Sequence, residues 1–166
     1  QLGATLKESL PTSQRSKIIT HTLETLWNGK TKVVENASEI DVVGHRVVHG
    51  GATYRESVLI SSEVKAEIDR LSVFAPSHNP ANLEGIHAIE QALGNVPQVA
   101  VFDTAFHAKL PPAATVYPIP YEWFEKGVRR YGFHGISHQY CAHRAAQILD
   151  RDLPDLKLIV CHIGNG

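Results

Sequence analysis

The sequence has little of what marks a secreted, membrane-bound or nucleic-acid-binding protein. Its only two cysteines, Cys141 and Cys161, form no CxxC pair or disulfide framework, which fits a reducing compartment. No apolar run approaches bilayer length and no signal-peptide pattern appears at the start, so a cytoplasmic location away from the membrane is expected. With 16 basic against 17 acidic residues, there is no global attraction to nucleic acid. Any anion must be bound by local groups.

Methionine is absent altogether, so the sequence contains no initiator residue. The sequence also stops at 160–166, where an apolar run enters a Gly-rich turn, although natural termini normally lie in exposed, dispensable chain. We therefore expect the 166 residues to be an internal piece of a longer protein. Their hydrophobic content of 43% is sufficient for the core of one ordinary domain.

Hydrophobic periodicity predicts strands that alternate with helices, which is an α/β arrangement. Strands are expected at 41–48, 99–102, 158–161 and, restricted by prolines, 115–119. Helices are expected at 62–71, 81–93, 13–27 and 137–149, the last of them capped by Ser137, with a loop at 74–80. Glycines and polar residues follow the strands at 49–51, 103–104 and 162–166. Because ligands of open α/β sheets bind beyond the carboxyl ends of strands, we expect one shared site there.

Arg46 and Val48 are the first candidate site residues. On a strand, residues two apart share a face, so these two side chains point the same way. A guanidinium beside a valine could recognise the charged and alkyl ends of a small carboxylate. The alternative is an arginine in a structural ion pair, which is the favoured interpretation when Arg46 is considered alone.

Asp103 follows the apolar run Val99-Ala100-Val101-Phe102. A carboxylate at the tip of a buried strand is costly to desolvate unless it meets a cation or a donor. Two interpretations remain open: Asp103 pairs with a substrate-binding arginine or a reacting group, or it caps the following turn.

Glycines flank Phe133 and His134, so the backbone there can adopt unusual angles and present the imidazole. A histidine beside a helix start suits an anionic ligand, although a capped loop-to-helix junction with an incidental histidine is the alternative. The final residues 162–166 could wrap amide groups around phosphates, but Asn165-Gly166 is also a common hairpin turn.

Histidines four residues apart raise the question of zinc, at His45 and His49 and again at His134 and His138. Gly135 interrupts the second pair at a helix start, and neither pair contains the glutamate of a zinc protease. We therefore interpret these side chains as hydrogen-bonded histidines and expect no metal site in this chain.

Five segments taken together resemble the acetate kinase family, in that family's order and approximate spacing. The segments are 45–51, 75–83, 102–107, 131–138 and 161–166. The resemblance implies a ribonuclease-H-like α/β fold of the acetate and sugar kinase/actin superfamily, with a mixed sheet flanked by helices that is incomplete here. It also implies that residues 1–166 form most of the N-terminal, carboxylate-binding domain, without its first strand and without the C-terminal nucleotide-binding domain.

By position, the resemblance makes Arg46 the carboxylate-binding arginine, Asp103 an active-site aspartate and His134 a transition-state histidine. It also implies two further groups. The walls of the small substrate pocket are Val48, Ser77 and Phe133. The start of the ATP phosphate loop is His162, Ile163, Gly164, Asn165 and Gly166. Ser77 stands where the family usually has leucine and Ile136 where it usually has threonine, so the pocket is expected to differ in shape.

The activity implied is reversible phosphoryl transfer from ATP to acetate, with ATP/ADP and Mg²⁺ as cofactors and the Mg²⁺ ligands outside this chain. A homodimer is expected of the intact enzyme, and the 166 residues alone are expected to be inactive. Because acetate is already ionised near neutral pH, we expect Asp103 to orient its partners and not to abstract a proton. Propionate or another short-chain carboxylate as substrate, and a catalytically dead binding module, are the alternatives.

Overall fold

A computed structural model describes residues 4–10 and 15–164 of the chain. Within these residues, helices and strands are mixed along the chain. The order is α1 (Arg15–Glu24), β1 (Val43–Val47), β2 (Val58–Leu59), α2 (Ser62–Arg70), α3 (Asn79–Leu93), β3 (Gln98–Phe102), α4 (Pro112–Thr115), α5 (Glu122–Glu125) and α6 (Gly135–Leu149). Short 3₁₀ helices are η1 (Gly29–Thr31), η2 (Ala37–Glu39), η3 (Leu71–Val73), η4 (Ala105–His107) and η5 (Leu153–Asp155).

The strands form one mixed sheet in the order β1-β3-β2. β1 and β3 are parallel, with Val43 opposite Gln98 and Val47 opposite Phe102. β2 pairs with β3 in the antiparallel direction, with Val58 opposite Ala100. The expected α/β class with a mixed sheet is confirmed, and β2 is a strand that the sequence pattern did not predict.

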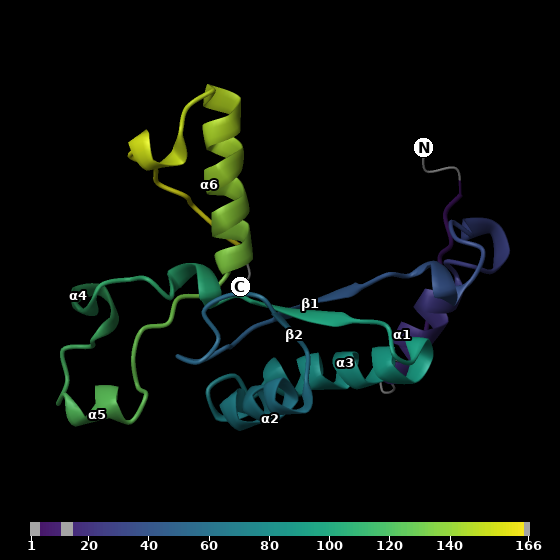
Figure 1. Cartoon of the computed structure of the whole chain (residues 1–166), viewed down its shortest axis with the longest axis horizontal. Coiled ribbons are helices and arrows are strands. Elements are labelled where there is room, and N and C mark those ends of the chain that lie inside the picture. The colour runs from purple at the N-terminus through teal and green to yellow at the C-terminus, as the bar shows by residue number, and fades with distance from the viewer. Residues whose placement is uncertain (1–3, 11–14, 165–166) are drawn as a thin grey trace.

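The core lies between the sheet and the helices α2 and α3, which run below the strands in Figure 1. Its fully buried side chains come from both strands and both helices, namely Val47, Val64, Ile68, Ile86, Ala100 and Phe102. The ring of Tyr54 stacks on Phe102 at 5.0 Å between centroids. β1 alternates between partly buried and exposed residues up to Val47, so Arg46 points away from this core.

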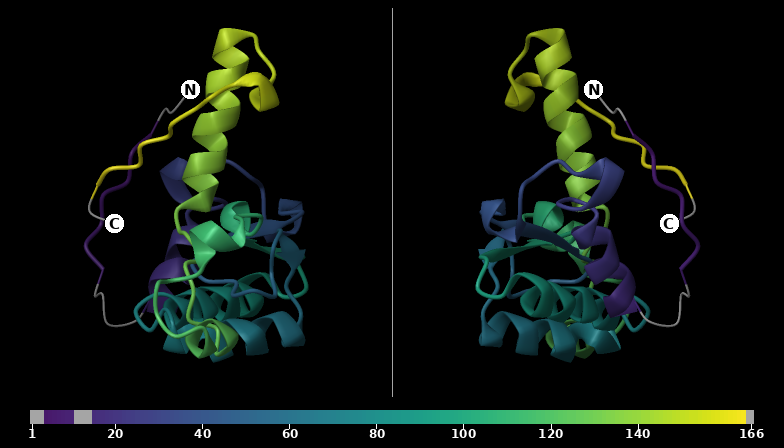
Figure 2. Two further views of the ribbon diagram at one scale, coloured as in Figure 1. Left: turned by 90° about the vertical axis from the view of Figure 1, so that its left-hand side faces the viewer. Right: turned by 90° about the vertical axis from the view of Figure 1, so that its right-hand side faces the viewer.

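Helix α6 stands on the other side of the sheet and extends away from it, as Figure 2 shows from two sides. Much of its surface is exposed, including Tyr140, Ile148 and Leu149. No helix among the described residues is both long and apolar enough to cross a bilayer.

Two expected strands do not form. Thr115 ends α4 and residues 116–119 follow as irregular chain, because the prolines at 118 and 120 have no N–H to donate to a ladder. Residues 158–161 are extended but unpaired, and Ile159 is 87% exposed, because no strand of the described chain lies beside them. A strand requires a neighbour, and an apolar run does not show whether one is present.

Helix boundaries also differ from the prediction. α3 begins at Asn79 inside the expected loop, with Pro80 in its first turn, where a missing N–H costs nothing. α6 begins at Gly135, so Ser137 lies within the helix and is not its cap. Residue 13 of the first expected helix lies outside the described chain, and α1 ends three residues before Trp27.

Candidate active site

The carboxyl ends of β1 and β3 lie at the same edge of the sheet because the two strands are parallel. Hydrogen bonds tie these ends together: the Asp103 N–H donates to the Val47 carbonyl at 2.9 Å, and the Gly50 N–H donates to Thr104 Oγ1 at 3.1 Å. The polar segments that follow the two strands therefore meet, as their positions in the sequence predicted.

Arg46 and Asp103 form an ion pair at this edge. Arg46 Nη2 donates to Asp103 Oδ2 at 2.6 Å, and Arg46 Nε lies 3.1 and 3.2 Å from the two carboxylate oxygens. The Asp103 side chain is 1% exposed, whereas that of Arg46 is 58% exposed. The hydrogen bonds that Arg46 donates to Asp103 raise the pKa of Arg46. A buried carboxylate thus holds an accessible guanidinium in place, with Nη1 and one N–H of Nη2 unused by Asp103.

Two asparagines of α3 position the end of β1. Asn82 Oδ1 accepts the Val48 N–H at 3.1 Å, and Asn79 Oδ1 accepts the His49 N–H at 3.2 Å. The Asn79 amide also donates to the carbonyls of His49 and Ile68, at 3.2 and 3.0 Å. Asn79 is fully buried, so these bonds satisfy backbone groups that water cannot reach.

His134 occupies the left-handed region, with φ 54° and ψ 28°, immediately before α6. For a residue other than glycine this conformation costs on the order of 1–3 kcal/mol and persists where the surroundings enforce it. The Gly135 N–H donates to the Asp103 carbonyl at 2.9 Å, and His107 Nε2 lies 3.0 Å from the Phe133 carbonyl oxygen. A Cβ at residue 135 would overlap that Asp103 carbonyl oxygen, so only glycine allows this approach. The start of α6 is therefore locked against the end of β3.

Histidines gather around the first turn of α6. The rings of His134 and His162 are 4.2 Å apart between centroids, and His138 lies 6.0 Å from His162. His162 Nδ1 is hydrogen-bonded to Ser137 Oγ at 3.0 Å. Desolvation, together with the neighbouring histidines His107, His162 and His134, lowers the pKa of His138. The His138 imidazole is therefore mostly in its neutral form at neutral pH.

Arg46, Asp103 and His134 line one open cavity of about 600 Å³. Its remaining lining comes from α6 and the segment beyond it, namely Ile136, Ser137, Tyr140 and His162. The guanidinium, the histidines and the amino end of α6 all favour an anion, because helix N-termini present free N–H groups and a positive dipole. The arrangement can hold a carboxylate and a phosphoryl group side by side.

The described residues contain no group of three or more His, Cys, Asp or Glu side chains able to hold a metal ion. His45 and His49, four residues apart, lie on and just after a strand and make separate contacts. His45 Nε2 is bonded to Gln98 Oε1 at 2.6 Å, and His49 Nδ1 accepts the Gly51 N–H at 3.0 Å.

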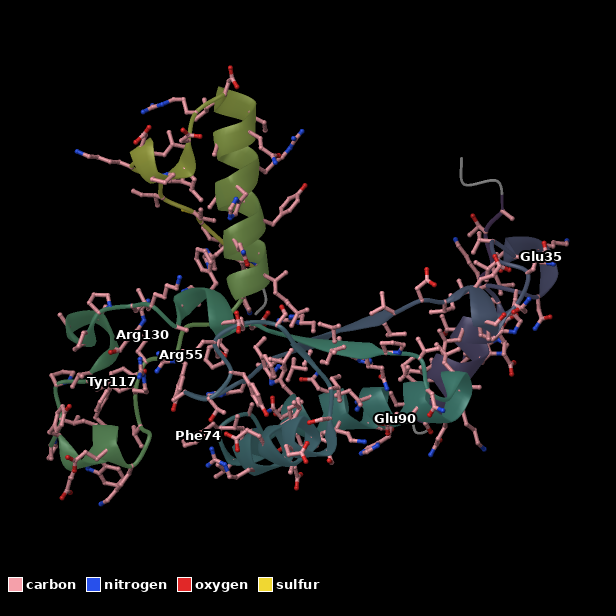
Figure 3. The ribbon with its side chains drawn as sticks, in the orientation of Figure 1. Glu35, Arg55, Phe74, Glu90, Tyr117 and Arg130 are labelled. Atoms are coloured by element: carbon pink, nitrogen blue, oxygen red, sulfur yellow. The ribbon has the colours of Figure 1, made fainter. Side chains whose placement is uncertain are left out.

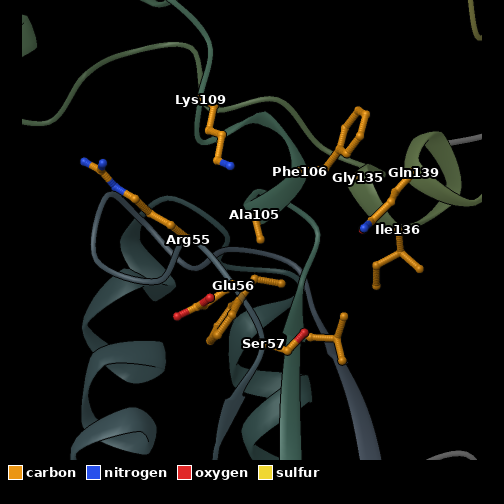
Figure 4. A pocket seen from close by; sticks show the side chains of 11 residues that line it. Arg55, Glu56, Ser57, Ala105, Phe106, Lys109, Gly135, Ile136 and Gln139 are labelled. Atoms are coloured by element: carbon orange, nitrogen blue, oxygen red, sulfur yellow. The ribbon is translucent and has the colours of Figure 1, made fainter. Parts of the chain in front are cut away.

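A second cavity, of about 420 Å³, lies between β3 and the start of α6 (Figure 4). Arg55, Glu56 and Lys109 provide its charged groups, and Ile136 borders both this cavity and the larger one. It contains neither histidine nor a buried carboxylate, whereas the larger cavity combines both with a guanidinium.

Comparison with known proteins shows the family of the chain. Residues 3–166 match the acetokinase family. The chain belongs to this family. It is 66% identical to the acetate kinase of Cyanothece sp. over 164 residues and 63% identical to that of Gloeobacter violaceus over 161 residues. These alignments cover 99% and 96% of this chain but 40% of each relative, so the chain spans about 40% of the length of these acetokinases.

Solved structures of the same family share the fold. The acetate kinase of Porphyromonas gingivalis superposes with a TM-score of 0.80 at 44% identity, over 89% of this chain and 37% of that one. A propionate kinase from Francisella tularensis superposes with a TM-score of 0.78 at 38% identity, over 87% of this chain and 37% of that one. The fold is therefore that of acetate and propionate kinases, present in part.

The residues expected to form the substrate pocket do not line the cavity of Arg46 and His134. Val48 is 9% exposed, Ser77 is exposed, and Phe133 is 42% exposed and packs edge-on against His49 at 5.6 Å. None of the three lines the cavity of Arg46 and His134. Of the expected phosphate loop, His162 lines that cavity and residues 163–164 follow it, whereas 165–166 lie outside the described chain.

Sequence reasoning missed three residues that shape this site. Asn79 was taken as loop, although an Asn-Pro pair before an amphipathic run is itself a helix-start signal. His107, which holds the Phe133 carbonyl, and Tyr140, which lines the cavity, have no local signal. His107 contacts a residue more than 20 positions further along the chain, and Tyr140 reaches the cavity because of the direction of α6.

Proposed function

We propose that the protein to which this chain belongs transfers a phosphoryl group reversibly from ATP to acetate, giving acetyl phosphate and ADP by direct in-line transfer. The observation that carries the proposal is the cavity where the Arg46–Asp103 pair faces His134, in a chain of the acetokinase family. Phosphoryl transfer needs alignment and charge stabilisation more than covalent catalysis, and these groups are of the type required.

Arg46 binds the carboxylate of acetate in this proposal. Its guanidinium is exposed to the cavity, while its Nε and one Nη2 hydrogen are engaged by Asp103. The remaining N–H groups can donate to the two carboxylate oxygens in the paired geometry that guanidinium favours. Because Asp103 prevents rotation of the fork, little side-chain entropy is lost when acetate binds.

Asp103 acts as a positioning residue. Its carboxylate is buried, and Arg46 is its hydrogen-bond partner among the described side chains. Acetate has an ordinary carboxylic-acid pKa and is ionised near neutral pH, so the nucleophile needs no base. Orientation of Arg46 is therefore the role that the chemistry leaves to Asp103.

His134 donates a hydrogen bond to an equatorial oxygen of the transferring phosphoryl group. Its left-handed backbone aims the imidazole from the amino end of α6, where the helix N–H groups add partial positive charge. One such donor, held in place before the reaction, contributes about 3–4 kcal/mol of transition-state stabilisation. The His162 ring lies beside that of His134, and His162 begins the segment proposed to follow the ATP phosphates.

The proposal assigns this chain most of the N-terminal, carboxylate-binding domain. The nucleotide-binding domain, the Mg²⁺ ligands and the homodimer contacts then belong to the remaining length of the protein. Mg²⁺ would neutralise charge on the ATP phosphates there. In this proposal the enzyme is cytoplasmic and has no nucleic-acid or membrane partners, which the family and the balanced charge of the chain support.

The test is ATP-dependent acyl phosphate formation, trapped with hydroxylamine, by the chain extended to the length of its relatives. Acetyl phosphate is the expected product, and the 166 residues alone are expected to form none. An extended protein that folds and binds acetate but forms no acyl phosphate would identify a binding module on this scaffold and contradict the proposal.

Propionate is the second candidate substrate, because the propionate kinase from Francisella tularensis superposes nearly as well as the acetate kinase. Ser77, where the family usually has leucine, also removes apolar bulk from the expected pocket. The ratio of kcat/KM on acetate and propionate decides between the two, and a ratio in favour of propionate would reassign the substrate while leaving the reaction unchanged.

A further inference from the structure

Two adjacent arginines line a cavity separate from that of Arg46 and His134, and Phe133, an expected wall of the substrate pocket, also borders it. Arg129 and Arg130, in the segment between α5 and α6, border a hollow of about 390 Å³ whose aromatic walls include Phe74, Tyr117 and Tyr131. Figure 3 marks Phe74, Tyr117 and Arg130 on the same side of the molecule. Its size falls within the range of small-molecule sites.

One buried nitrogen of Arg129 has no hydrogen-bond partner among the described residues. Its guanidinium carbon lies 5.3 Å from the Phe124 ring centroid and 5.5 Å from that of Tyr131. Arg129 Nε is buried and has no hydrogen-bond partner among the described residues. Native proteins pair nearly all buried polar groups, and an unpaired one commonly indicates a missing water, ion or ligand. The two rings fix the guanidinium in place while leaving its hydrogen-bonding capacity unused.

The lining of this Arg129 cavity contains no aspartate or glutamate. His49 also lines it, but burial lowers its pKa, and its Nδ1 accepts the Gly51 N–H, so the ring is a neutral donor through Nε2. Neither arginine of the cavity is in an ion pair within the described chain. Three other guanidinium groups are paired with carboxylates, namely those of Arg15, Arg46 and Arg70, whereas Arg55, Arg144 and Arg151 bond carbonyl or amide oxygens. The cavity therefore lacks a negative charge to balance its two arginines.

We propose that the Arg129 cavity binds a small aromatic anion, with its charged group on the two arginines and its ring among the aromatic walls. Guanidinium forks match carboxylate and phosphate oxygens, which supplies the anionic half of the ligand. Aromatic side chains gather around a planar ring in offset or edge-to-face contact, which supplies the other half. An aryl carboxylate and an aryl phosphate share this chemistry.

The experiment is a titration of the full, ¹⁵N-labelled chain with phenyl phosphate, benzoate and inorganic phosphate, followed by NMR. Phenyl phosphate or benzoate is expected to shift the Arg129 Nε–H and the backbone amides of 127–133 saturably. The dissociation constant of the better aryl probe is expected to be about tenfold lower than that of inorganic phosphate, because only the aryl probes bury a ring. The stronger of the two aryl probes identifies the anionic group.

Arg129→Gln is expected to weaken binding of the better aryl probe by about tenfold or more, since a charge-assisted hydrogen bond is lost. Arg144→Gln, which removes an exposed arginine of α6, is the matched control and should leave binding unchanged. If Arg129→Gln does not fold, Arg130→Gln replaces an exposed side chain and should weaken binding severalfold.

Three results would overturn the proposal. The first is that neither aryl probe shifts 127–133 saturably, and the second is that inorganic phosphate binds as tightly as both aryl probes. The third is that Arg46→Gln abolishes the aryl binding, which would place the anion at the candidate active site. Because the Arg46 variant separates the two cavities, failure here leaves the phosphoryl-transfer proposal unaffected.

Discussion

At the residue scale, the candidate site depends on the difference in exposure between the two partners of one ion pair. Asp103 is buried and Arg46 is largely exposed, so the carboxylate acts as an anchor and the guanidinium as the binding group. A catalytic base would need a path to the proton it removes, whereas both oxygens of Asp103 face Arg46. Substitutions of Asp103 therefore distinguish orientation from proton transfer.

Asp103→Asn is expected to retain about tenfold more kcat/KM for acyl phosphate formation than Asp103→Ala in the extended protein. Asparagine keeps one oxygen for Arg46, and a hydrogen bond to a charged group contributes about 1.5–3 kcal/mol. Asp69→Ala, at an exposed aspartate of α2, serves as the control and should leave activity unchanged. Equal losses in the two Asp103 variants, with folding intact by circular dichroism, would count against an orienting role.

At the element scale, the junction between β3 and α6 decides where the imidazole of His134 points. Gly135 is the contact residue, since its N–H bonds the Asp103 carbonyl and its missing side chain permits the approach. The expected helix start at Ser137 was wrong because the cap preference of serine is a local signal, whereas this contact joins segments more than 30 residues apart.

Gly135→Ala is expected to lower the free energy of unfolding by about 1–3 kcal/mol, because the new methyl group overlaps backbone that cannot move freely. Gly85→Ala in α3 is the matched control. No atom lies within 4 Å of its added Cβ, so alanine should stabilise the helix by about 0.5–1 kcal/mol. Urea unfolding midpoints measure both, and a Gly135 variant as stable as the parent would show that the junction is loose.

At the scale of the whole molecule, the buried His49 and the partly buried His45 connect stability to pH. Desolvation by burial is the main cause that lowers the pKa of His45 and that of His49 in the fold, and at His45 the hydrogen bond to Gln98 Oε1 partly opposes it. In the unfolded chain both groups titrate near their ordinary value of 6.5. The unfolded chain therefore binds more protons as the pH falls below that value, and stability decreases.

Thermal unfolding temperatures are expected to fall between about pH 7.5 and pH 5.5. His45→Gln should flatten this dependence, since glutamine can still bond Gln98 without titrating. His143→Gln, at an exposed position of α6, should leave the slope unchanged. A parent protein whose unfolding temperature rises on acidification would show that carboxylates or exposed groups dominate instead.

The helix and strand order and the candidate residues were largely predictable from the sequence. The apolar residues of β1 and β3 indicated buried strands, and the polar residues Arg46, Asp103 and His134 stand out against them. Residues 158–161 show the limit, because the same apolar signal produced no strand where the described chain offers no neighbour. Local patterns report what a segment prefers, and pairing decides whether it can form.

The sequence by itself determined the α/β class and the side chains present at the strand ends, because periodicity and residue chemistry are properties of short segments. Only the tertiary structure decided that Arg46 meets Asp103, 57 residues away, and that the buried partner is the carboxylate. It also decided that Arg129 lies between two rings with its Nε unpaired. Such contacts depend on how distant segments pack, and no local signal specifies them.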